Sequence, residues 1–125
     1  MTKTVLDVGN CSPDHNAIKK MLVANYDVEV LRADQWADTQ RILLSKAVDL
    51  ILVNRKLDID YSDGMDILKS LKSDEATRQI PVMLVTNYPE HQQAAVEAGG
   101  VYGFGKLELD SPQTRERLGQ FLTSR

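Results

Sequence analysis

Two nearly unbroken hydrophobic runs, VDLILV at residues 48–53 and IPVMLVT at residues 80–86, constrain the fold of this chain most strongly. A strand with one solvated face alternates apolar and polar residues, but these runs leave no polar face. Strands buried on both faces are typical of parallel sheets that helices cover on each side. Shorter or weaker runs at residues 4–9, 27–31 and 100–105 predict three further strands.

The segments between and after these runs carry helical patterns with recognisable starts. Serine and aspartate favour the N-cap of a helix, and proline favours its first turn. The expected caps or first residues, in chain order, are Ser12, Asp34, Asp63, Pro89 and Ser111. Strict alternation of strand and helix requires right-handed crossovers. We therefore expect a single α/β domain over residues 1–125, with helices on both faces of a parallel sheet.

Charge and cysteine content exclude several classes of function. The 125 residues include 15 basic and 18 acidic ones, interleaved to a net charge of -3, whereas nucleic acids and anionic membranes select concentrated basic patches. No apolar stretch approaches the ~18 residues of a membrane helix, and the N-terminus is no signal peptide. The single cysteine, Cys11, excludes an internal disulfide and a cysteine-based metal site. We expect a cytoplasmic protein with neither nucleic acid nor membrane as its partner.

The residues that end the predicted strands indicate where a site should lie. In an open parallel sheet, ligands gather beyond the carboxyl ends of the strands. The residues at these ends are Asn10 and Cys11, Asn54, Thr86 and Asn87, and Lys106. This edge therefore offers amides, a hydroxyl, a thiol and one ammonium group, but no carboxylate.

The order and spacing of these motifs resemble the receiver domain of two-component response regulators over nearly the whole chain. The motifs are PVMLVT ending in Thr86, AGG at residues 98–100, Lys106 after the fifth strand, VDLILVN leading to Asp63-Gly64, and Pro13 three residues after Asn10. The resemblance implies a flavodoxin-like (βα)5 fold, a three-layer α/β/α sandwich with strand order 2-1-3-4-5. It also implies a site in which an acidic pair and an aspartate bind Mg²⁺, and in which that aspartate accepts a phosphoryl group.

Carried over position by position, the resemblance puts uncharged side chains where the family has carboxylates. Asn10 and Cys11 match the acidic pair, and Asn54 matches the phosphoryl acceptor. Thr86 and Lys106 match the hydroxyl and the amine that contact the phosphoryl oxygens. Amides and thiols are poor Mg²⁺ ligands, and a carboxamide is a poor nucleophile. We therefore expect no metal, no cofactor, no enzymatic activity and no phosphorylation at Asn54, with Lys106 left without its usual counter-charges.

Further departures flank this site. The loop at residues 55–63 is longer than in the family and lacks its usual proline. Leu107 replaces the proline that normally follows the lysine. The position of the family's switch aromatic falls on Gly103, between Tyr102 and Phe104.

These features favour an interaction module, a pseudo-receiver in phosphorelay signalling of the bacterial type. Its partners would be a histidine kinase, another regulator, an output protein or a second copy, bound through the fourth helix, fifth strand and fifth helix. The alternative is a sensor that holds a small anion or metabolite around Lys106, with Asn54 and Thr86. A flavin carrier or small enzyme is disfavoured, because no phosphate-binding loop and no paired nucleophile and base are visible.

Several other residues carry weaker expectations. Cys11 lies near a helix start, where a thiol pKa can fall, but most single cysteines are inert and redox sensing is the minority interpretation. Asp7, inside a buried strand, either marks an edge near water or pairs with a lysine. His15 and His91 are expected on the surface. The acidic loop around Asp58 misses the EF-hand pattern and is interpreted as solvated.

Overall fold

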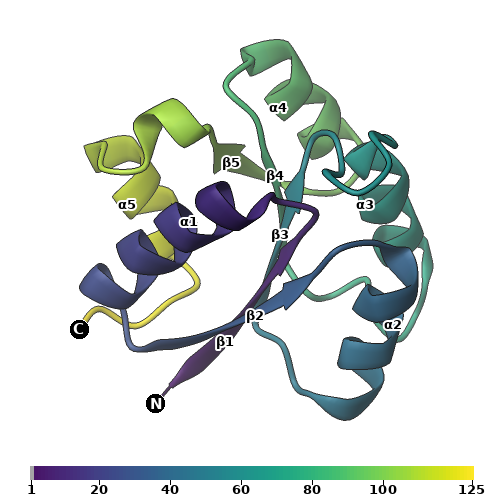
Figure 1. Cartoon of the computed structure of the whole chain (residues 1–125), viewed down its shortest axis with the longest axis horizontal. Coiled ribbons are helices and arrows are strands. Elements are labelled where there is room, and N and C mark those ends of the chain that lie inside the picture. The colour runs from purple at the N-terminus through teal and green to yellow at the C-terminus, as the bar shows by residue number, and fades with distance from the viewer. Residues whose placement is uncertain (1) are drawn as a thin grey trace.

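A five-stranded parallel sheet in the order β2-β1-β3-β4-β5 forms the centre of the fold (Figure 1). The computed structural model describes residues 2–125. The strands are β1 (Lys3–Val8), β2 (Val28–Ala33), β3 (Leu50–Asn54), β4 (Val82–Val85) and β5 (Val101–Phe104). The strand order confirms the predicted flavodoxin-like arrangement, in which β1 and β3 are neighbours and β2 and β5 are the edges.

Five α-helices alternate with the strands and cover both faces of the sheet. They are α1 (Ser12–Asn25), α2 (Trp36–Ser45), α3 (Gly64–Ser73), α4 (Pro89–Glu97) and α5 (Pro112–Gly119), and a short 3-10 helix η1 (Lys106–Glu108) precedes α5. Figure 1 shows α1 and α5 together on one side of the sheet, and α2 and α3 on the other. Within residues 2–125, no helix is both long and apolar enough to cross a membrane.

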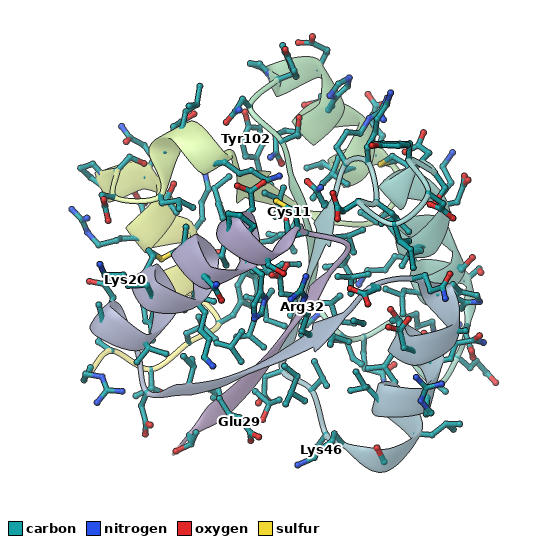
Figure 2. The ribbon with its side chains drawn as sticks, viewed as in Figure 1. Cys11, Lys20, Glu29, Arg32, Lys46 and Tyr102 are labelled. Carbon is teal, nitrogen blue, oxygen red and sulfur yellow. The ribbon has the colours of Figure 1, made fainter. Side chains whose placement is uncertain are left out.

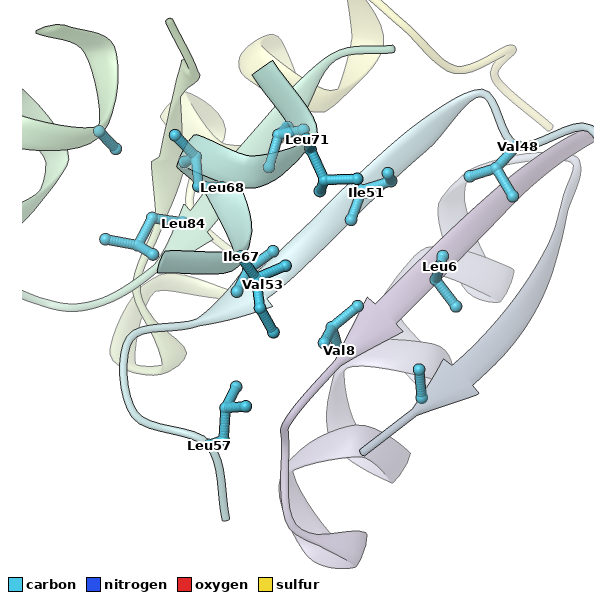
Figure 3. Close-up of a cluster of buried hydrophobic side chains, with 13 residues drawn as sticks. Leu6, Val8, Val48, Ile51, Val53, Leu57, Ile67, Leu68, Leu71 and Leu84 are labelled. Carbon is cyan, nitrogen blue, oxygen red and sulfur yellow. The ribbon is translucent and has the colours of Figure 1, made fainter. Parts of the chain in front are cut away.

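The side chains of β3 explain why its sequence is continuously hydrophobic. Leu50 and Leu52 pack into the cluster that α1 and α5 cover. Ile51 and Val53 point to the opposite cluster, under α2 and α3, where Figure 3 shows them among the leucines of α3. Because successive side chains of a strand face opposite sides, a strand between two helical layers has no solvated face.

Three predicted helix starts are confirmed. Asp63 is the N-cap of α3, and its carboxylate accepts a hydrogen bond from the backbone N–H of Met65 (2.9 Å). Ser111 caps α5 in the same way by accepting from the N–H of Thr114 (3.2 Å). Pro89 is the first residue of α4. The side chains of Asp63 and Ser111 satisfy backbone donors that the first turn of a helix leaves free.

The predicted caps of α1 and α2 are wrong by one residue. Ser12 is the first residue of α1, and Cys11 is its N-cap without a side-chain hydrogen bond. The N-cap of α2 is Gln35, not Asp34. Asp38 in the first turn of α2 accepts hydrogen bonds from the N–H groups of both residues (2.7 and 2.9 Å), which makes a cap from Asp34 unnecessary.

Candidate functional site

A pocket of about 340 Å³ opens at the carboxyl ends of β3, β4 and β5. It brings together three of the residues singled out from the sequence, Asn54, Thr86 and Lys106. The other charged or titratable residues in its lining are Arg55, Lys56, Tyr88 and His91. None of the described lining residues carries a carboxylate, so the pocket wall is basic.

Asn54 ends β3 and uses its amide nitrogen to hold the following loop. Its Nδ2 donates to the carbonyl oxygen of Lys56 (2.6 Å) and, less closely, to that of Gly9 (3.4 Å). Asn54 thus fastens the loop after β3 to the loop after β1. A carboxylate in the same place could not donate these bonds.

Asn10 does not line the pocket, although the strand-end argument predicts that it should. It is 2% exposed, and its Nδ2 donates to the carboxylate of Asp7 (2.5 Å). Its Oδ1 is buried without a hydrogen-bond partner among the described residues. Arg32 of β2, which is labelled in Figure 2, donates to the Asn10 carbonyl oxygen (3.2 Å).

Asp7 is fully buried and is bonded to His15, so the expectations for both residues are wrong. The Nδ1 atom of His15 lies 2.6 Å from the Asp7 carboxylate, and His15 is only 7% exposed. Burial raises the pKa of Asp7, and the hydrogen bonds from His15 and Asn10 lower it by less. The sequence carried a signal, because His15 lies three residues before Ile18, on the apolar face of its helix.

Lys106 has a counter-charge that the sequence analysis missed. Its Nζ lies 2.7 Å from a carboxylate oxygen of Asp14, in the first turn of α1. The expectation that Lys106 lacks counter-charges is therefore wrong. The hydrogen bond from Lys106 lowers the pKa of Asp14, and a hydrogen bond involving the Cys11 thiol lowers it further. This pair spans 92 residues of sequence, so spacing alone could not reveal it.

Thr86 and His91 form the wall of the pocket next to α4. The Thr86 hydroxyl lies 3.1 Å from Nδ1 of His91 and accepts a hydrogen bond from the N–H of Tyr88 (3.3 Å). The His91 ring meets that of Tyr88 edge-on, with centroids 5.3 Å apart. His91 is half-buried by these contacts, whereas a surface position was expected.

Gly103 of β5, the position that the resemblance assigns to the family's switch aromatic, packs against Gln92, a buried residue of α4. A Cβ added to Gly103 would lie 2.5 Å from the carbonyl oxygen of Leu84, so no aromatic side chain fits there without a shift of the backbone. The register between β4 and β5 is irregular at this point. Gln92, which is 2% exposed, accepts from the Gly103 N–H (2.8 Å) and donates to the Leu84 carbonyl (3.0 Å).

The two aromatic residues beside Gly103 have different surroundings. Phe104 is 1% exposed and belongs to the core under α1 and α5. Tyr102, which is labelled in Figure 2, is half-buried. The Arg117 guanidinium lies 4.4 Å above its ring. Tyr102 is therefore the aromatic group of β5 that a partner bound to the face formed by α4, β5 and α5 would contact.

The described side chains do not fit Mg²⁺. Within residues 2–125, no three His, Cys, Asp or Glu side chains are arranged to hold a metal ion. At the carboxyl edge, Asp14 is bound to Lys106, and Asp63 caps α3 and lies 3.7 Å from Arg55. A divalent cation would have to displace these cations to gain anionic ligands.

No protein-family model and no curated protein matches the sequence. The receiver domain of the Francisella response regulator 1452 superposes with a TM-score of 0.76 at 16% identity, over 95% of this chain and 96% of that one. This chain has the receiver fold. A putative response regulator from Chloroflexus aurantiacus superposes with a TM-score of 0.75 at 20% identity, over 95% of this chain and 99% of that one.

A third similar structure is the signal receiver domain of a DNA-binding response regulator from Colwellia psychrerythraea. It has a TM-score of 0.72 at 18% identity and covers 94% of this chain and 96% of that one. The receiver fold therefore extends over nearly all described residues. At these identities the similarity concerns the fold alone, and a fold does not determine a function.

Proposed function

We propose that this chain is an atypical receiver domain of two-component signalling, which is not phosphorylated at Asn54 and acts by binding other proteins. Its partners are a histidine kinase, another regulator, an output protein or a second copy of the chain. The proposal assigns Asn54 to the phosphoryl-acceptor position, Asn10 and Cys11 to the acidic pair, and Thr86 and Lys106 to the phosphoryl contacts. In this assignment the domain has no catalytic residues of its own.

The observation that carries the proposal is the way the uncharged residues are used. The side-chain amide of Asn54 donates hydrogen bonds to two backbone carbonyls, and that of Asn10 donates one to Asp7. These bonds hold the loops of the carboxyl edge in place, a structural role for residues where the family has ligands and a nucleophile. Lys106, the expected phosphoryl contact, is already neutralised by Asp14.

Acetyl phosphate and Mg²⁺ provide the direct test. After incubation, intact-protein mass spectrometry is expected to find no stoichiometric phosphate adduct on the wild-type protein. The Asn54→Asp variant is expected to stay unmodified as well, because Asn10 and Cys11 still offer no anionic metal ligand. A receiver domain with an intact acidic site serves as the positive control. A stoichiometric adduct on wild-type protein would contradict the proposal.

A second candidate function, binding of a small anion, is favoured by the basic wall of the pocket. The described lining holds Arg55, Lys56 and Lys106 and no carboxylate. A ligand that binds only the folded state raises the melting temperature. A thermal shift with millimolar phosphate or sulfate, abolished in the Lys106→Met variant and retained in Lys20→Met, is the expected result. Equal shifts in both variants would count against this pocket.

A further inference from the structure

The carboxyl edge of the sheet carries an acidic loop next to the basic pocket. Residues 58–61 of this loop read Asp-Ile-Asp-Tyr, and all four are exposed. The apolar members are exposed to an unusual degree, Ile59 at 53% and Tyr61 at 76%. The loop leaves β3 through Arg55 and Lys56, which are themselves part of the pocket wall. A negative, partly apolar projection and a positive recess thus lie on the same end of the molecule.

The backbone holds this loop in one shape. The N–H of Leu57 donates to the Ser62 carbonyl (2.9 Å), and the N–H of Tyr61 donates to the Leu57 carbonyl (2.8 Å). Asp60 accepts hydrogen bonds from both the N–H and the hydroxyl of Ser62 (2.9 and 2.6 Å), which lower its pKa. Tyr61 sits at a φ of 60°, a conformation that is unfavourable for an aromatic residue. A loop that is already ordered loses little conformational entropy on binding.

Among the cations of the pocket, Lys56 is the one available to a partner. Lys106 is paired with Asp14 at 2.7 Å, and Arg55 lies 3.7 Å from Asp63. Lys56 is exposed and makes no ion pair within residues 2–125. An incoming carboxylate would therefore meet Lys56 without breaking an existing pair.

Exposed apolar side chains beside the pocket point to a macromolecule. Tyr88 is 59% exposed and lines the pocket, and Leu107 is 86% exposed. The Leu107 N–H donates to the side-chain oxygen of Asn87 (3.1 Å), which joins the two loops. An anion small enough for the pocket would leave Leu107 uncovered, whereas a protein surface would bury it.

We propose that two copies of this chain pair through their carboxyl edges, with the loop at residues 58–61 of each copy entering the basic pocket of the other. A two-fold dimer requires that both complementary parts lie on one surface, as they do here. The inference rests on the proposed role as an interaction module and deepens it by naming the partner and the surface. This surface lies at the carboxyl edge of the sheet and meets the face formed by α4, β5 and α5 at His91.

Two variants with opposite charge changes test the pairing. The first is Lys56→Glu, which replaces the unpaired cation of the pocket with an anion. The second combines Asp58→Lys with Asp60→Asn, which makes the loop positive but keeps the Oδ1 acceptor that Ser62 uses. Sedimentation equilibrium is expected to find dimers of the wild type. Each variant alone should dissociate with a Kd raised at least ~10-fold, equivalent to about 1.4 kcal/mol. An equimolar mixture of the two should dimerise again, because both loop–pocket contacts then join opposite charges.

Two control variants distinguish this interface from others. Lys69→Glu reverses an exposed charge on α3, and Arg117→Glu changes the face that carries Tyr102. Both are expected to dimerise like the wild type, with circular dichroism showing that all variants are folded. A wild type that stays monomeric up to millimolar concentration overturns the proposal. So does a mixture that fails to dimerise, or a dimer lost in Arg117→Glu but kept in Lys56→Glu. None of these outcomes changes the result expected with acetyl phosphate. The proposed dimer can therefore be refuted while the proposed lack of phosphorylation at Asn54 stands, and the reverse.

Discussion

Replacing Gly64 with alanine is expected to lower the free energy of unfolding by about 3 kcal/mol, the upper end of the usual cost of overpacking. A Cβ at this position would lie 2.0 Å from the carbonyl oxygen of Asn54 and 2.9 Å from the Val53 side chain. The first of these atoms belongs to the backbone of a buried strand and cannot turn away. The start of α3 would have to move off β3, and the loop that Asn54 holds would move with it.

Urea unfolding followed by the fluorescence of Trp36, the only tryptophan, measures this loss. Gly119→Ala is the matched control, because a Cβ there would meet no atom within 4 Å. Alanine in place of a helical glycine is expected to stabilise the fold by up to about 1 kcal/mol. If Gly64→Ala unfolded at the same urea concentration as the wild type, the close approach of α3 to β3 would be refuted.

Removing His15 is expected to destabilise the protein even more, by about 3–5 kcal/mol in a His15→Leu variant at neutral pH. The substitution leaves the fully buried Asp7 carboxylate with Asn10 as its remaining hydrogen-bond donor. The reverse change, Asp7→Leu, is expected to cost about 1–3 kcal/mol, because it leaves a buried imidazole without its hydrogen-bond partner. The double variant should recover much of the loss, since it leaves no buried charge.

The pH dependence of this loss has a definite sign. Burial raises the pKa of Asp7 above its ordinary value of 3.8, so the unfolded chain releases this proton at a lower pH than the folded one. The stability that protonated Asp7 contributes is therefore present below pH 3.8, its ordinary pKa. It is lost as the pH rises through the raised pKa of Asp7 in the folded protein. The cost of His15→Leu should therefore shrink as the pH is lowered towards the pKa of Asp7. A cost that is equal at all pH values would show that the imidazole acts only through packing.

The fold was predictable from the sequence because its strongest signals are local. A strand such as β3 is hydrophobic at every position because two helical layers cover it, and that reveals both the strand and the sheet type. Helix starts were predictable where one side chain decides them, as at Ser111. They were misplaced by one residue at α1 and α2, where a thiol and a glutamine with no preference for the N-cap occupy that position.

The candidate site was less predictable, because its important contacts join distant segments. The strand-end rule gathers Asn54, Thr86 and Lys106 in one pocket. It does not reveal that Lys106 is paired with Asp14, because that contact depends on how η1 and α1 lie relative to each other. The pairing of Asp7 with His15 was visible in part, as a polar residue on the apolar face of α1.

The hydrogen bond between Asn10 and Asp7 also limits how this protein can change. An aspartate at position 10 would place a second carboxylate about 2.5 Å from the first, in a site that is closed to water. Two such groups cannot both be ionised there. The two positions are therefore epistatic: an aspartate at position 10 is expected to destabilise the fold less after Asp7 has been replaced than before.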